Sequence, residues 1–274
     1  MIVFHLVEQT NDGEHTFAVY DCRPEEGGDL AAVLAETIRD LYVDPDRLRD
    51  VLTAAMNDAG AVADTAAIDE AIQRTLAAAI PEPGTHPIPH LDVARNELAE
   101  ALAHLALAEV HGTVIPAARI RNKEVPDQPS RGRDLLGLDD GPLVAVIGEI
   151  KASAESASPP GVVGDGDSSL RGQFLGFLAV EDALLTELNW ALKHAAPEHQ
   201  DLIARAIMAH ILGGLPLCAA PVLVRPVDVR GADDFGTFKD EPGQFAPARI
   251  RFSVLTVDGA LDELANAVYE EARR

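Results

Sequence analysis

The sequence predicts an α/β protein with a mixed central sheet flanked by helices and a smaller N-terminal α+β domain. Two observations lead to this prediction. Residues 2–20 alternate apolar and polar positions around the turn Asn11-Asp12-Gly13, as a β-hairpin does. Downstream, segments with helical spacing of apolar residues are interleaved with short apolar runs. In the second half the order helix, strands, helices, strand favours a sheet covered by helices.

Each element follows from local signals. Apolar residues recur at 3.6-residue spacing over 30–41, 48–52 and 67–76, which predicts helices. Asp92 can cap a helix over 92–111, and Gly112 ends it. Residues 134–138 and 143–152 flank the turn Asp139-Asp140-Gly141-Pro142 and form a predicted hairpin. Helices are expected over 170–193, 198–212 and 261–273, and strands over 221–225 and 248–255.

A proline-rich segment divides the chain. Residues 81–89 contain four prolines and one glycine, so neither a helix nor a central strand can run through them. We therefore expect a domain boundary here, with a partner-binding or regulatory α+β domain over residues 1–85 and the chemistry in residues 90–274.

The net charge limits the partners. Forty-five acidic residues against 22 basic ones give a formal charge of −23, which excludes a generic basic DNA-coating protein. Any contact with nucleic acid needs a local basic patch, bound metal ions or a partner that supplies positive charge. Two cysteines are too few for a disulfide framework, and there is no signal peptide or membrane-spanning run, so we expect a cytoplasmic protein.

The predicted strand over 143–152 ends in two charges. It is apolar at successive positions, as a central buried strand is, until Glu149 and Lys151. Period-two geometry points both side chains to one face. Charges at the end of a buried strand are costly unless they are used. Asp134, at the start of the preceding strand, lies close enough in a hairpin to bring its carboxylate beside that of Glu149.

Two adjacent carboxylates favour a divalent cation between them, and oxygen ligands of this kind suit Mg²⁺ or Mn²⁺. Lys151 then lies beside the metal-bound water, where it can orient or deprotonate the nucleophile or stabilise charge on a phosphate. The chain contains 22 basic residues, of which only four are lysines, so a lysine at this position is notable. Together these residues predict a phosphodiester hydrolysis site.

The same residues carry a family resemblance. Gly132-Arg133-Asp134, followed by Gly148-Glu149-Ile150-Lys151 at a strand end and preceded by an acidic helix, resembles the PD-(D/E)XK restriction-endonuclease-like superfamily. Within it, residues 98–102, 114–120, 132–138 and 147–151 together resemble the HamA nuclease subunit of Hachiman antiphage defence systems, over about residues 90–225. The resemblance implies a restriction-endonuclease-like core and a Mg²⁺-dependent DNase that is paired with, and restrained by, a helicase partner, HamB.

The resemblance also implies roles for individual residues. Asp134 and Glu149 correspond to metal ligands, Lys151 to the catalytic lysine and Glu100 to the acid on the helix, which also contributes to the metal site. Glu97 lies three residues earlier on the same helix and is an alternative to Glu100, although the pattern Leu-x-Glu-x-Leu favours Glu100. Arg133 stands where the superfamily has its proline.

A basic cluster leads into Asp134 and is the expected contact with the DNA backbone. Its members are Arg119, Arg121, Lys123, Arg131 and Arg133. Two functions fit these observations. The first is a metal-dependent DNase of an antiphage system, restrained by a helicase. The second is a non-catalytic module of the same fold that binds a protein or a DNA end, in which Glu149 and Lys151 are only ion-paired.

Overall fold

The structure is a computed structural model that describes residues 1–58, 64–83, 93–122, 132–164 and 166–274. Its centre is a mixed sheet with the strand order β1-β2-β6-β5-β4-β3. The two outer pairs, β1 with β2 and β3 with β4, are antiparallel, and the central pairs are parallel. The strands are β1 (Ile2–Asp12), β2 (His15–Pro24), β3 (Leu135–Asp139), β4 (Val144–Ala152), β5 (Leu217–Pro226) and β6 (Arg249–Val257).

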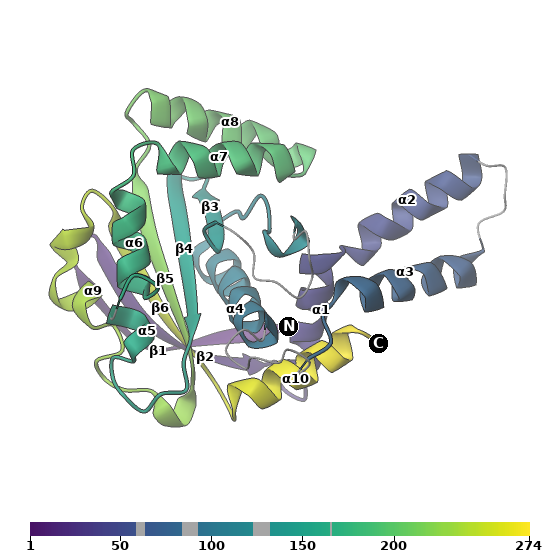
Figure 1. The fold of residues 1–274 in the computed structure, drawn as a ribbon, viewed down its shortest axis with the longest axis horizontal. Helices are drawn as coiled ribbons and strands as arrows, with labels where there is room; N and C mark the ends of the chain where they lie inside the picture. The colour runs from purple at the N-terminus through teal and green to yellow at the C-terminus, as the bar shows by residue number, and fades with distance from the viewer. Residues whose placement is uncertain (59–63, 84–92, 123–131, 165) are drawn as a thin grey trace.

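Helices cover both faces of this sheet (Figure 1). One face packs against α1 (Leu30–Tyr42), α4 (Val93–His111) and α10 (Leu261–Ala272), and the other against α6 (Leu170–Leu178), α7 (Ala183–His194) and α8 (Pro197–Ile211). The remaining helices are α2 (Pro45–Asp58), α3 (Thr65–Ala79), α5 (Gly161–Gly164) and α9 (Thr237–Asp240), with short 3₁₀ turns at Ile120–Asn122, Val227–Val229 and Pro242–Phe245. The expected α/β class with a mixed sheet between helices is confirmed.

The central strand β4 shows why its sequence is apolar at successive positions. Val146 and Ile150 belong to the core under α4, whereas Ala145 and Ile147 belong to the core under α6. Side chains alternate between faces along a strand, so both faces of β4 are buried. By the same alternation the Glu149 side chain points toward the α6 layer, on the same face of β4 as Ala145 and Ile147.

The N-terminal hairpin differs from the expected organisation. We predicted a separate α+β domain over residues 1–85, but β2 pairs in parallel with β6, from Thr16 opposite Arg251 to Asp21 opposite Thr256. The described residues therefore show no separate N-terminal domain. Phe17 and Val19 pack into one core and Ala18 and Tyr20 into the other, which is typical of an interior strand. The expected boundary at 85–90 lies outside the described residues.

One part of the N-terminal region does stand away from the sheet. Helices α2 and α3 form a pair that projects from the body of the molecule (Figure 1). None of the residues of α2 is buried, while α3 buries Ile68, Ile72 and Leu76 at helical spacing. The projecting pair therefore presents most of α2 to solvent.

A further difference concerns residues 170–193, for which we expected a single helix. The chain instead forms α6 and α7, separated by a turn in which Asp182 has a positive φ of 62°. A left-handed residue cannot continue an α-helix, and the break redirects the chain across the end of the sheet. Among the described helices, none is both long enough and apolar enough to cross a bilayer.

Candidate active site

The β3–β4 hairpin sets the position of the two predicted metal-binding carboxylates. Leu135 pairs with Gly148, so Asp134 and Glu149 are adjacent across the end of this ladder. A Cβ at position 148 would lie 2.9 Å from the Leu135 Cβ, which explains a glycine before Glu149. Asp134 Oδ2 accepts a hydrogen bond of 2.8 Å from the backbone N–H of Ile150. This bond fixes the Asp134 carboxylate against β4.

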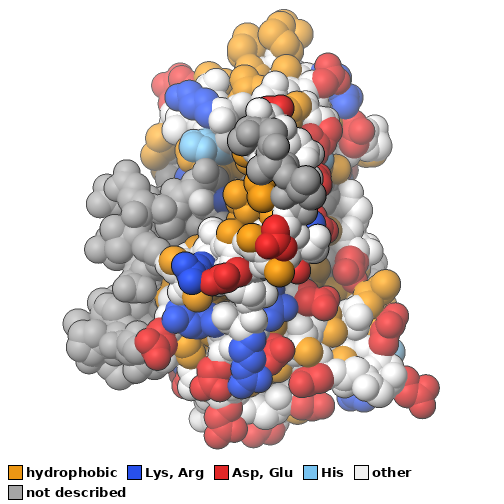
Figure 2. All heavy atoms as spheres, turned by 90° about the vertical axis from the view of Figure 1, so that its right-hand side faces the viewer, with side chains coloured by type: hydrophobic (Ala, Val, Ile, Leu, Met, Phe, Trp, Pro, Cys, Tyr) orange, Lys and Arg blue, Asp and Glu red, His pale blue; other side chains and the backbone are white. Residues whose placement is uncertain are grey.

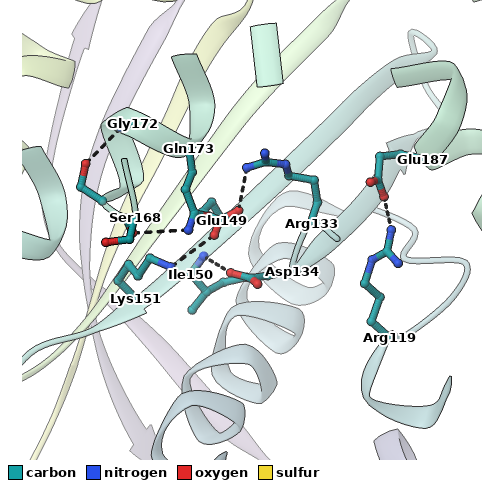
Figure 3. A network of polar contacts seen from close by, with 11 residues as sticks. Arg119, Arg133, Asp134, Glu149, Ile150, Lys151, Ser168, Gly172, Gln173 and Glu187 are labelled. Carbon is teal, nitrogen blue, oxygen red and sulfur yellow. Dashed lines mark hydrogen bonds and ion pairs between the residues drawn. The ribbon is translucent and has the colours of Figure 1, made fainter. Parts of the chain in front are cut away.

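Two cationic side chains reach Glu149 from opposite sides (Figure 3). Lys151 Nζ lies 3.3 Å from Oε1, and Arg133 Nη1 lies 3.2 Å from Oε2. The Glu149 side chain is almost fully buried, with a residue exposure of 2%, whereas Arg133 and Lys151 are partly exposed. The structure thus brings Asp134, Glu149 and Lys151 together, as the sequence predicted, and adds Arg133 to the group.

Burial perturbs both acids, and the charge of Asp134 also acts on Glu149. Burial, followed by the charge of Asp134, raises the pKa of Glu149 to about 7, although Lys151 and Arg133 act in the opposite direction. Burial also raises the pKa of Asp134, against the effect of the Ile150 N–H and the nearby cations. Perturbed carboxylates of this kind mark candidate functional sites. The two acids therefore favour additional positive charge between them.

The structure distinguishes the two helix acids that the sequence left open. Glu97 is buried and accepts hydrogen bonds from the hydroxyls of Tyr42 and Tyr269. Glu100 instead lines a small cavity together with Asp134. The same cavity is lined by Ile150 and by the imidazole of His104, whose pKa burial lowers to about 4. Glu100 is thus the acid of α4 on the Asp134 side.

Arg119 and Arg121, two described members of the predicted basic cluster, point to different parts of the protein. Arg119 forms an ion pair with Glu187 and stacks 4.0 Å from the Trp190 ring centroid. Arg121 donates to the backbone carbonyl of Asp40 and lies 3.8 Å from Asp44. Their guanidinium groups are thus directed to different acids. Lys123 and Arg131 lie outside the described residues.

The surroundings of Arg133 include a residue that the sequence reasoning missed. The Arg133 guanidinium carbon lies 5.4 Å from the centroid of the Phe177 ring, within the range of a cation–π interaction. Phe177 lies on α6 and is otherwise part of the apolar core. Its helical spacing with Phe174 indicates only a buried helix face, so no sequence signal identifies it as a site residue.

The donor set at this site suits a divalent cation. Among the described residues, no three His, Cys, Asp or Glu side chains form a group arranged to hold a metal ion. Two adjacent carboxylates are present, both with raised pKa, and hard oxygen ligands of this type are those that Mg²⁺ and Mn²⁺ prefer. The Asp134–Glu149 pair therefore fits the predicted ion, with Glu100 across the adjoining cavity.

Comparison with known proteins connects this site to a family. A family model described as HamA matches residues 2–207. The chain belongs to the HamA family. HamA is the A subunit of the Hachiman antiphage defence system, so the chain is a Hachiman component. A search of curated proteins gave no match.

The HamA match includes four of the six strands of the sheet, β1 to β4. It begins in β1 and ends in α8, so it includes the N-terminal hairpin as well as Glu100, Asp134, Glu149 and Lys151. The resemblance to HamA seen in the sequence motifs covers about residues 90–225. The earlier start of the match is consistent with β2 being an interior strand of the same sheet.

Proposed function

We propose that this HamA-family chain is a metal-dependent deoxyribonuclease that hydrolyses phosphodiester bonds and is restrained by a HamB-like helicase. The observation that carries the proposal is the meeting of Asp134, Glu149 and Lys151 at the end of the β3–β4 hairpin. Membership of an antiphage defence family supports DNA as the substrate.

Each side chain has a role that follows from its position. Asp134 and Glu149 would hold the cation, with Glu100 contributing from α4. A bound Mg²⁺ polarises a phosphoryl oxygen and lowers the pKa of its water. Lys151, whose side-chain nitrogen lies beside Glu149, would orient the attacking water or stabilise negative charge on the phosphate as an ammonium, or deprotonate the water as the neutral amine.

The charge of the protein supports a requirement for a partner. The formal charge of −23 repels DNA, and two of the predicted basic contacts face acidic groups. Figure 2 shows Lys and Arg side chains interspersed with Asp and Glu on the face toward which α2 and α3 project. A helicase partner would supply DNA to the site. We propose the projecting pair of helices, α2 and α3, as a regulatory surface. This keeps the regulatory role predicted for residues 1–85 but assigns it to these two helices.

A direct experiment tests the activity. Purified protein is incubated with supercoiled plasmid and MgCl₂, with and without a HamB-like helicase. We expect cleavage with Mg²⁺, no cleavage with EDTA, and loss of cleavage in Glu149→Ala and Lys151→Ala.

Arg205→Gln is a suitable control because Arg205 is exposed on α8 and pairs with Asp140 and Asp201. Equal cleavage by wild type and both site variants would exclude this site.

One observation favours a second candidate function. Glu149 forms ion pairs with both Lys151 and Arg133, which is also what a purely structural charge cluster would do. In that case the chain is a non-catalytic module that binds a protein or a DNA end. Retention of partner binding and of phage protection by Lys151→Ala would support this candidate over the nuclease.

A further inference from the structure

Glu149 already has a cationic partner at each of its two carboxylate oxygens. Arg133 Nη1 occupies one Glu149 oxygen at 3.2 Å and Lys151 Nζ the other at 3.3 Å. A divalent cation that enters this group meets two cations at close range. Because such repulsion is strong in a partly buried site, one of the two must move away.

Arg133 is the cation that we expect to move. Lys151 lies within β4, where it pairs with Leu223 of the interior strand β5, so the sheet holds its backbone on that side. Arg133 precedes β3, an edge strand of the sheet, and is not part of a strand itself. Its guanidinium also lies over the Phe177 ring, 5.4 Å from the centroid, while it is paired with Glu149, and this contact can remain when the ion pair is broken.

We propose that Arg133 is a placeholder cation: it pairs with Glu149 in the metal-free protein and is exchanged for the divalent ion, leaving Glu149 but keeping its contact with Phe177 when the ion binds. Arg133 therefore lowers the affinity of the site for metal and is a positioning residue. This inference rests on the proposed metal-dependent function. It also changes the expected role of Arg133 as a DNA contact, since its guanidinium is available to a phosphate only after release from Glu149.

The binding of Mn²⁺ to the full chain, measured by isothermal titration calorimetry, tests the proposal without any activity assay. Arg133→Gln removes the competing charge, and we expect its Kd for Mn²⁺ to fall on the order of tenfold. Arg133→Lys keeps the charge, so its Kd should stay near the wild-type value. Arg205→Gln removes the same charge from an exposed site on α8 and should have no effect. Thermal unfolding in EDTA checks that each variant is folded.

A second variant, Phe177→Leu, should change the affinity for Mn²⁺ in the opposite direction, and it can be measured even if Arg133→Gln does not fold. Phe177→Leu keeps an apolar side chain but removes the aromatic face, which is the contact left to the guanidinium after its release from Glu149. We expect Mn²⁺ binding to weaken. The proposal is overturned if Arg133→Gln binds Mn²⁺ no more tightly than wild type, if Arg133→Lys gains as much affinity as Arg133→Gln, or if Phe177→Leu binds more tightly.

The outcomes also separate this inference from the proposed function. If wild type binds Mn²⁺, Asp134→Asn loses it and Arg133→Gln is unchanged, the placeholder role fails while the metal site stands. If neither wild type nor Arg133→Gln binds Mn²⁺, both proposals fail.

Discussion

Tyr269 donates a hydrogen bond of 2.6 Å to Glu97, joining the last helix of the chain to the helix that carries Glu100. Tyr42 of α1 donates to the same carboxylate oxygen. Glu97 therefore connects three helices of one layer, which is a structural task. Glu100, one turn further along α4, lines the cavity beside Asp134.

This difference predicts opposite phenotypes for the two acids. Glu97→Ala leaves two buried tyrosine hydroxyls without their acceptor, and we expect a loss of about 2–4 kcal/mol in the free energy of unfolding. Glu100→Ala should change stability by less than about 1 kcal/mol but strongly reduce plasmid cleavage. Urea unfolding and the cleavage assay measure the two effects. Loss of cleavage in Glu97→Ala at unchanged stability would assign the helix acid to Glu97 instead.

The raised pKa of Glu149 predicts that the metal-free protein loses stability as the pH rises. The folded protein holds the Glu149 proton up to about pH 7, while the unfolded chain releases it near 4.5. The contribution is thus complete below about pH 4.5 and is lost as the pH rises to about 7, and its size is roughly 3 kcal/mol. Denaturant unfolding in EDTA at several pH values measures it. Glu149→Gln should remove this part of the pH dependence, and an unchanged profile in that variant would contradict the prediction.

Asp134 should control the titration of Glu149. Its negative charge is the second cause of the raised Glu149 pKa, after burial. In Asp134→Asn that repulsion is absent, so the Glu149 pKa should move down toward its ordinary value while remaining raised by burial. Carboxyl ¹³C chemical shifts of the metal-free protein followed against pH give the midpoint. A midpoint that stays the same or rises in Asp134→Asn would show that the two carboxylates do not interact.

A buried ion pair holds the loop that follows Lys151. Arg225, fully buried at the end of β5, pairs with Asp234 and donates to the backbone carbonyls of Glu155 and Ala157. Arg225→Ala leaves the Asp234 charge buried without this partner, so we expect a loss of about 3–5 kcal/mol in the free energy of unfolding.

The matched control for this pair is the exposed contact between Arg205 and Asp140. Arg205→Ala should cost between about 0 and 1 kcal/mol because solvent screens the pair. Thermal or urea unfolding compares the two variants. Similar losses in both would mean that burial does not set the strength of the Arg225 pair.

The local part of the site was predictable from the sequence because it depends on short-range rules. The turn at 139–142 sets the β3–β4 register, which brings Asp134 to Glu149, and strand alternation places Lys151 on the Glu149 face. The helix acid could be narrowed to two positions but not to one. The choice depends on Tyr42 and Tyr269, which lie far from α4 in the sequence.

Long-range pairing explains what the sequence reasoning missed. The parallel contact of β2 with β6 joins residues more than two hundred positions apart, and no local pattern encodes that partner. The apolar run Phe17-Ala18-Val19-Tyr20 is typical of an interior strand. The turn at 11–13 and the preceding strand, however, led us to predict an independent hairpin. The approach of Arg133 to Phe177 likewise depends on how α6 packs over the sheet.

The most direct test of the account is the position of a divalent ion in crystals of the full chain grown with MnCl₂. Anomalous diffraction at the manganese edge locates the ion without reference to activity. We predict a peak between the Asp134 and Glu149 carboxylates that disappears in Asp134→Asn crystals. Wild-type crystals with no peak at these two side chains, at a Mn²⁺ concentration that supports plasmid cleavage, would contradict the account.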